Sequence, residues 1–124
     1  MCDTRVVCVV DDDDGVRRSV RNLLSALRFR VEAFDSAESF LHSMHRENIG
    51  CLVLDLRMPG MSGEELLIHL ANAGAPIPTV ILTAHGDSRV RERLRALGVL
   101  AVLSKPFKSE LLLKAISAAM GLKP

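Results

Sequence analysis

Four short apolar runs in this chain are each followed by side chains that can take part in ionic or phosphoryl chemistry. The run VVCVV leads into four consecutive aspartates that begin with Asp11 and Asp12, and the run CLVL leads into Asp55. The run TVIL is followed by Thr83, and LAVLS is followed by Lys105. Their shared position after apolar runs indicates one site rather than four unrelated surface features.

Each of these residues also has an ordinary structural explanation. Asp13 or Asp14 fits the N-terminal cap of a helix, and we assign that role to this pair. Asp55 could form a turn before Pro59, a threonine could simply end a strand, and Lys105 could be a solvated surface residue. These explanations account for the residues one at a time. They do not explain why all of them follow buried runs.

Three converging carboxylates repel one another, by on the order of 4 kcal/mol for each pair at about 4 Å and an effective dielectric constant near 20. A cation must offset this repulsion. A few hard oxygen ligands with room for water suit Mg²⁺, which commonly binds one or two carboxylates together with phosphate oxygens. Lys105 and Thr83 can contact phosphate oxygens, and Asp55 can act as a nucleophile that forms an acyl phosphate.

The fold must bring the ends of these runs together. Runs at residues 6–10, 51–54, 79–82 and 100–103 are short and uniformly apolar, which predicts strands buried on both faces, and 29–34 is a weaker candidate for a strand. Between them, apolar residues recur at helical spacing in 16–27, 37–44, 66–70, 90–97 and 111–119. This alternation predicts an α/β fold with a parallel sheet and helices on both faces, whose ligands bind at the carboxyl ends of the strands.

Several predicted helix boundaries carry capping signals. Asp35 and Glu38 have the spacing of a capping box, with Asp in place of the usual Ser or Thr. Ser62 is expected to cap the third helix, and Asp87 or Ser88 the fourth. Glycines stand where three helices should end: Gly74, Gly98 and Gly121.

Composition bounds the class of protein. A chain of 124 residues with 48% hydrophobic residues fits one domain over 1–124, and its formal charge of +1 favours neither nucleic acid nor an anionic membrane. No apolar stretch is long enough to cross a bilayer. The three cysteines, Cys2, Cys8 and Cys51, are odd in number and lack CxxC spacing, and two of them lie inside apolar runs. This pattern is typical of a reducing compartment, so we expect a cytoplasmic protein.

The remaining histidines and a group of arginines suggest surface roles. We interpret the histidines as surface or edge residues: His42, His45 and His69. The arginines of the fourth predicted helix suggest a protein interface: Arg89, Arg91, Arg93 and Arg95.

The segments VVDDDDGVR, LVLDLRMPGMSG, ILTAHGD and LSKPF together resemble the receiver domain of bacterial two-component response regulators. The resemblance covers essentially the whole chain, with the motifs in the family's order and spacing. The segments MPGMSG and TAHGD most resemble those of the FixJ-like regulators. In these regulators the receiver usually precedes a helix-turn-helix DNA-binding domain of the LuxR type. We therefore expect this chain to be a fragment of a longer regulator.

The resemblance implies a flavodoxin-like receiver fold with strand order 2-1-3-4-5. It implies that Asp55 accepts a phosphoryl group from a sensor histidine kinase, that Asp12 ligates Mg²⁺ directly, and that Asp11 does so through water. The backbone carbonyl of Arg57 completes the protein ligands. Thr83 and Lys105 would contact the phosphate, and the peptide between Lys105 and Pro106 is expected to be cis.

One position departs from the family's pattern. Members often carry Tyr or Phe three residues before the lysine, as a switch that moves after phosphorylation, and this chain has Val102 there. We therefore expect Thr83 and the loop through His85 and Gly86 to shift the fourth helix directly, or the receiver to signal weakly. His85 either influences attack of water on phosphorylated Asp55 or is an exposed loop residue.

The sequence suggests three candidate functions. The leading hypothesis is a phosphorylation-dependent switch, not an enzyme, that changes the surface around the fourth helix, the fifth strand and the fifth helix. Its expected partners are a sensor histidine kinase, a C-terminal output domain and a second phosphorylated copy. An Mg²⁺-dependent phosphohydrolase is less favoured, because such enzymes place a carboxylate where this chain has Arg57. A degenerate receiver that acts only in docking or dimerisation conflicts with the complete set of site residues.

Overall fold

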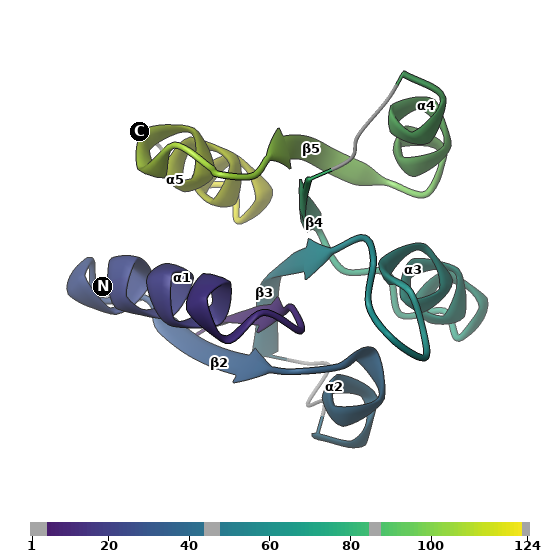
Figure 1. Ribbon diagram of the computed structural model, residues 1–124, viewed down its shortest axis with the longest axis horizontal. Helices are drawn as coiled ribbons and strands as arrows, with labels where there is room; N and C mark the ends of the chain where they lie inside the picture. Colours follow the sequence, from purple (N-terminus) through teal and green to yellow (C-terminus); the bar gives the residue numbers. More distant parts are fainter. Residues whose placement is uncertain (1–4, 44–47, 85–87, 123–124) are drawn as a thin grey trace.

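The computed structural model describes residues 5–43, 48–84 and 88–122. Five parallel strands form one sheet in the order β2-β1-β3-β4-β5 (Figure 1), which confirms the predicted order. The strands are β1 (Val6–Val10), β2 (Arg30–Phe34), β3 (Ile49–Asp55), β4 (Thr79–Thr83) and β5 (Val99–Ser104).

Helices cover both faces of the sheet. They are α1 (Asp14–Ala26), α2 (Ala37–Ser43), α3 (Gly63–Asn72), α4 (Ser88–Ala96) and α5 (Ser109–Ala119). Helices α1 and α5 lie on one face, and α2, α3 and α4 lie on the other (Figure 1). Among the described helices, none is long and apolar enough to cross a membrane.

Alternating residues of the central strands build a core on each side of the sheet. On β1, Cys8 and Val10 pack toward α2, α3 and α4, whereas Val7 and Val9 pack toward α1 and α5. Every residue of β1 and β4 is buried, as predicted for strands covered on both faces.

The burial predicted for strand β5 is wrong. Residues 100–103 were expected to be buried on both faces, but only Val99 of β5 is buried and Leu100 is 56% exposed. The strand lies at the edge of the sheet, where α4 and α5 cover it incompletely. An apolar run alone therefore does not distinguish a central strand from an edge strand.

The predicted N-terminal caps of α1 and α3 are present, and the predicted cap of α2 is not. The Asp13 side chain accepts a hydrogen bond from the Val16 amide at 3.2 Å and caps α1. Ser62 and Glu65 form the reciprocal capping box of α3, with distances of 3.1 and 3.0 Å. Gly74, Gly98 and Gly121 follow helix ends with positive φ angles, as predicted.

The predicted capping box between Asp35 and Glu38 is wrong. The Oγ atom of Ser36 accepts the hydrogen bond from the Ser39 amide at 3.0 Å, so the cap of α2 lies one residue later. The carboxylate of Glu38 instead accepts a hydrogen bond from the Met61 amide at 3.2 Å. Of the two residues predicted to cap α4, Asp87 lies outside the described residues, and Ser88 is the first residue of the helix itself.

Candidate functional site

The first acidic residues of the site follow β1. Asp11 is buried and Asp12 is exposed. The Asp13 amide donates to Asp11 Oδ1 at 2.9 Å, and the Arg17 guanidinium donates to the Asp11 backbone carbonyl at 2.7 Å. These bonds fix both the side chain and the backbone of Asp11 at the start of the turn into α1.

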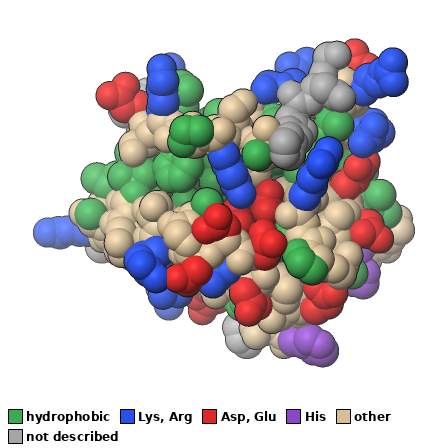
Figure 2. Space-filling model, viewed as in Figure 1, with side chains coloured by type: hydrophobic (Ala, Val, Ile, Leu, Met, Phe, Trp, Pro, Cys, Tyr) green, Lys and Arg blue, Asp and Glu red, His purple; other side chains and the backbone are tan. Residues whose placement is uncertain are grey.

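Asp55 is the last residue of β3, the strand next to β1, and is only 6% exposed. The register pairs Val10 with Leu54, so the residues that follow them, Asp11 and Asp55, emerge side by side. One carboxylate oxygen from each of Asp11, Asp12 and Asp55 lies within 4.8 Å of the others. Figure 2 shows acidic side chains gathered at the centre of this face. The predicted convergence of these three carboxylates is present.

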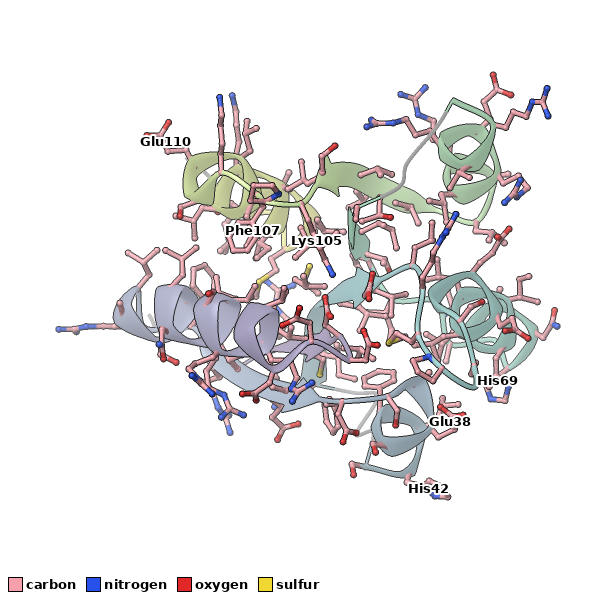
Figure 3. All side chains as sticks on the ribbon, in the orientation of Figure 1. Glu38, His42, His69, Lys105, Phe107 and Glu110 are labelled. Carbon is pink, nitrogen blue, oxygen red and sulfur yellow. The ribbon has the colours of Figure 1, made fainter. Side chains whose placement is uncertain are left out.

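Lys105 brings a cation to the same place. Its Nζ atom lies 2.8 Å from Asp11 Oδ2 and 3.5 Å from Asp55 Oδ1. Figure 3 shows its side chain extending from the end of β5 toward the ends of the central strands. The peptide between Lys105 and Pro106 is cis, as the family resemblance implied.

Thr83 lies at the same edge of the sheet. It is the last residue of β4 and is buried, and its backbone carbonyl accepts a hydrogen bond from the Lys105 amide at 2.9 Å. Since Leu82 pairs with Asp55 across the two strands, Thr83 follows immediately beyond the level of Asp55. The sequence prediction that Thr83 joins this edge is consistent with the register.

The site's charges change the proton affinity of Asp55. The pKa of Asp55 is raised from 3.8 to about 6, mainly by burial and then by the charge of Asp11, although Lys105 and the Arg57 amide oppose the increase. For Lys105, burial lowers the pKa, but contacts with Asp11 and Asp55 outweigh it and the net shift is upward. The lysine therefore remains protonated beside carboxylates that outnumber it.

The donor set fits a hard divalent cation. Three carboxylates from two adjacent strand ends face one ammonium group, and oxygen donors of this kind suit Mg²⁺. Arg57 contributes its amide to the Asp55 carboxylate, and its side chain is exposed. The role predicted for the Arg57 carbonyl stays a prediction.

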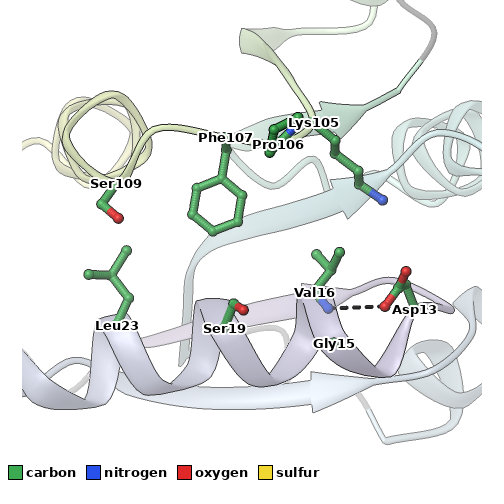
Figure 4. Close-up of a pocket in the computed structure, with 9 residues that line it drawn as sticks. All are labelled: Asp13, Gly15, Val16, Ser19, Leu23, Lys105, Pro106, Phe107 and Ser109. Atoms are coloured by element: carbon green, nitrogen blue, oxygen red, sulfur yellow. Dashed lines mark hydrogen bonds between the residues drawn. The ribbon is translucent and has the colours of Figure 1, made fainter.

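Sequence reasoning missed a hollow beside the acidic cluster. A cavity of about 520 Å³ lies between α1 and the segment from β5 to α5 (Figure 4), and its lining includes Leu23, Lys105, Phe107 and Ser109. Asp11, Asp12 and Asp55 do not line it, so the cavity adjoins the cluster and does not contain it. No spacing rule indicates this hollow, because its walls are far apart in sequence.

Other predicted residues play smaller parts. Val102 lies on β5 and packs, partly buried, against the core on the α4 side of the sheet. His42 and His69 are exposed. His85, Gly86 and His45 lie outside the described residues. On α4, Arg93 pairs with Glu64 of α3 at 3.0 Å.

Comparison with known proteins agrees with this geometry. The response regulator receiver domain family matches residues 7–117. The response regulator protein TodT of Pseudomonas putida is 38% identical over 119 residues, which cover 96% of this chain and 52% of TodT. The chain thus spans about half the length of that relative.

Solved structures give the same assignment. The structure of the response regulator StyR superposes with a TM-score of 0.90 at 47% identity, covering 95% of this chain and 60% of that one. The FixJ-N crystal structure superposes with a TM-score of 0.85 at 36% identity, covering 100% of this chain and 98% of that one. Members of this family are typically regulatory rather than catalytic, and their receivers generally use Mg²⁺ at an acidic pocket. The chain belongs to the response regulator receiver domain family and is a FixJ-like receiver, a phosphorylation-dependent signalling switch.

Proposed function

We propose that Asp55 is the phosphoacceptor of this switch and that a sensor histidine kinase is the phosphoryl donor. The observation that carries the proposal is the meeting of three carboxylates within 4.8 Å of one another, with the Lys105 ammonium 2.8 Å from one and 3.5 Å from another. Asp55 is the member of this set that ends a central strand and contacts both Lys105 and the Arg57 amide.

In the proposed reaction, an oxygen of Asp55 attacks the phosphorus of the kinase's phosphohistidine in line with the bond to be broken. The new bond joins Asp55 to phosphorus, the bond from phosphorus to the imidazole nitrogen breaks, and the imidazole takes the electron pair. Attack requires the ionised carboxylate. With a pKa of about 6, most of Asp55 is ionised at neutral pH.

The residues around Asp55 would bind the cation and contact the phosphoryl oxygens. Asp11, Asp12, Asp55 and the Arg57 carbonyl would hold Mg²⁺, which supplies positive charge that screens the carboxylates from the incoming phosphoryl group. Lys105 already contacts Asp55 Oδ1 and is in place to exchange that contact for a phosphoryl oxygen. Thr83, at the end of the neighbouring strand, would donate its hydroxyl to another oxygen.

In the proposed switch, the signal passes from the site to the surface without an aromatic side chain, because position 102 is a valine. Movement of Thr83 would shift α4 and so change the surface of α4, β5 and α5. That surface would contact a C-terminal DNA-binding output domain of the LuxR type or a second phosphorylated copy, in transcription regulation within the cytoplasm. We assign no nucleic-acid contact to the receiver itself, and no catalysis beyond its own phosphorylation and dephosphorylation.

Acetyl phosphate tests the assignment without the kinase. Incubation with acetyl phosphate and Mg²⁺ should add the mass of one phosphoryl group to the intact protein, and chelation of Mg²⁺ with EDTA should prevent it. Asp55→Ala should gain nothing, whereas the control Asp35→Ala, at an exposed aspartate outside the site, should behave as wild type.

Two outcomes would contradict the proposal. A protein that gains no phosphoryl group under any condition would be a docking module. A protein that hydrolyses many equivalents of a stable phosphomonoester such as p-nitrophenyl phosphate would be a phosphohydrolase.

A further inference from the structure

The carboxylate of Glu38 on α2 contacts the segment that follows Asp55. Its Oε2 atom accepts a hydrogen bond from the Met61 amide at 3.2 Å, across 23 residues of sequence. Figure 3 labels Glu38 where α2 approaches the connection between β3 and α3. Since Ser36 caps α2, this carboxylate is not needed to begin its own helix.

The geometry of Gly60 leaves room for this contact. A Cβ atom at Gly60 would lie 2.5 Å from Glu38 Oε2, and the residue has a φ angle of +77°. A glycine at this position meets both requirements, because it has no side chain and tolerates positive φ. The close approach of Glu38 is therefore accommodated by the backbone of the segment as well as by the Met61 amide.

The contacted segment runs between two fixed points. At its start, the backbone amide of Arg57 donates a hydrogen bond to the Asp55 carboxylate. The side chains of Leu56 and Met58 are buried in the same core as Phe40 of α2. At its end, the Gly63 amide donates to the Leu56 carbonyl at 3.0 Å. Between them the segment must bend through Gly60, and Glu38 holds the bend from outside.

We propose that Glu38 is a positioning residue for the cation site. By holding the Met61 amide, it keeps the segment after Asp55 in the conformation that presents the Arg57 carbonyl, and so it sets the affinity for Mg²⁺. The inference rests on the proposed function, because it assumes that the cluster of Asp11, Asp12 and Asp55 binds this cation. It gives α2 a role in the site although α2 supplies no residue to that cluster.

The test compares Glu38→Ala with Glu38→Gln. Both variants lose the negative charge, but only the glutamine retains an oxygen that can accept the Met61 hydrogen bond. Isothermal titration of the unphosphorylated proteins with MgCl₂, at about 0.15 M salt to screen surface charge, should show affinity weakened roughly threefold to tenfold in Glu38→Ala, as expected for one lost hydrogen bond. Glu38→Gln should stay within about twofold of wild type.

Two further measurements make the comparison specific. Glu110→Ala removes an exposed glutamate from the first turn of α5, far from this segment in Figure 3, and should leave the affinity unchanged. Hydrogen exchange of the Met61 amide, followed by NMR, should accelerate in Glu38→Ala and not in Glu38→Gln. Glu38 is exposed, so neither variant is expected to lose its fold.

The outcomes separate this inference from the proposed function. Equal weakening in Glu38→Ala and Glu38→Gln would show that only charge matters and would overturn the positioning role. Wild-type affinity in Glu38→Ala would overturn it as well. If the wild-type protein itself binds no Mg²⁺, the proposed function fails, and the positioning role fails with it.

Discussion

Replacing Asp55 by asparagine should stabilise the metal-free protein at neutral pH. Burial and the charge of Asp11 raise the pKa of Asp55 from 3.8 to about 6, which means that the folded state disfavours the ionised carboxylate. Each pKa unit corresponds to about 1.4 kcal/mol. The difference between 3.8 and about 6 therefore corresponds to a cost of about 3 kcal/mol when Asp55 is fully ionised.

The sign of the pH dependence follows from the direction of the shift. Below about pH 4, Asp55 is protonated in both the folded and the unfolded states, and the cost is absent. Between about pH 4 and 6 the unfolded state releases the proton first, so the folded protein loses stability as pH rises. Above about pH 6 the cost is constant. Asp55→Asn removes the charge at every pH, so its advantage should grow over this window.

Urea unfolding in EDTA, followed by far-ultraviolet circular dichroism, measures the effect, since the chain has no tryptophan or tyrosine for fluorescence. We expect Asp55→Asn to exceed the wild type by about 1 to 3 kcal/mol at pH 7, because the amide keeps the volume but gives up the ionic contact with Lys105. Near pH 4 the difference should largely vanish. Asp35→Asn, at an exposed aspartate, should show no comparable gain. A variant less stable than wild type at pH 7 would refute the reasoning.

Three further substitutions test other parts of the site. Lys105→Met removes a charge that lowers the pKa of Asp55, so NMR titration of the carboxyl carbon should show a pKa above the wild-type value of about 6; an unchanged or lower value would contradict the ion pair. Gly63→Ala should destabilise the protein by more than about 2 kcal/mol in urea unfolding, because a Cβ atom there collides with the Asp55 carbonyl, whereas Gly74→Ala meets no atom within 4 Å and should cost only about 1 kcal/mol for its positive φ. Val102→Ala should still gain one phosphoryl group from acetyl phosphate in intact mass measurements, and a loss as complete as in Asp55→Ala would mean that Val102 serves the chemistry rather than the output.

Much of the site could be predicted because it depends on strand ends. Apolar runs located β1, β3 and β4 closely enough to place Asp11, Asp55 and Thr83 at their carboxyl ends, and parallel pairing brings such ends to one edge. Asp12 follows as the next residue after Asp11. The local signals that succeeded, such as the Ser62 capping box, depend on residues within one turn of each other.

The failures share a different cause. Asp35 and Ser36 are adjacent and both can cap a helix, so the pattern alone did not decide between them, and the contact with Met61 took Glu38 away from its expected role. The exposure of Leu100 depends on how far α4 and α5 extend over an edge strand. These outcomes are set by tertiary packing, which spacing rules do not describe.

The register of the sheet, rather than attraction among the polar groups, determines where the charges lie. Val10 pairs with Leu54 because both are apolar and buried, and this pairing forces Asp11 and Asp55 together although they repel each other. The carboxylates cannot separate without disturbing central strands of the core, so the repulsion persists until a cation or a proton relieves it. Lys105, which follows β5, relieves part of this repulsion, and its backbone amide donates a hydrogen bond to the Thr83 carbonyl at the end of β4. A phosphoryl group on Asp55 would therefore compete with the carboxylates for Lys105. Any movement of Lys105 would in turn affect the ends of β4 and β5.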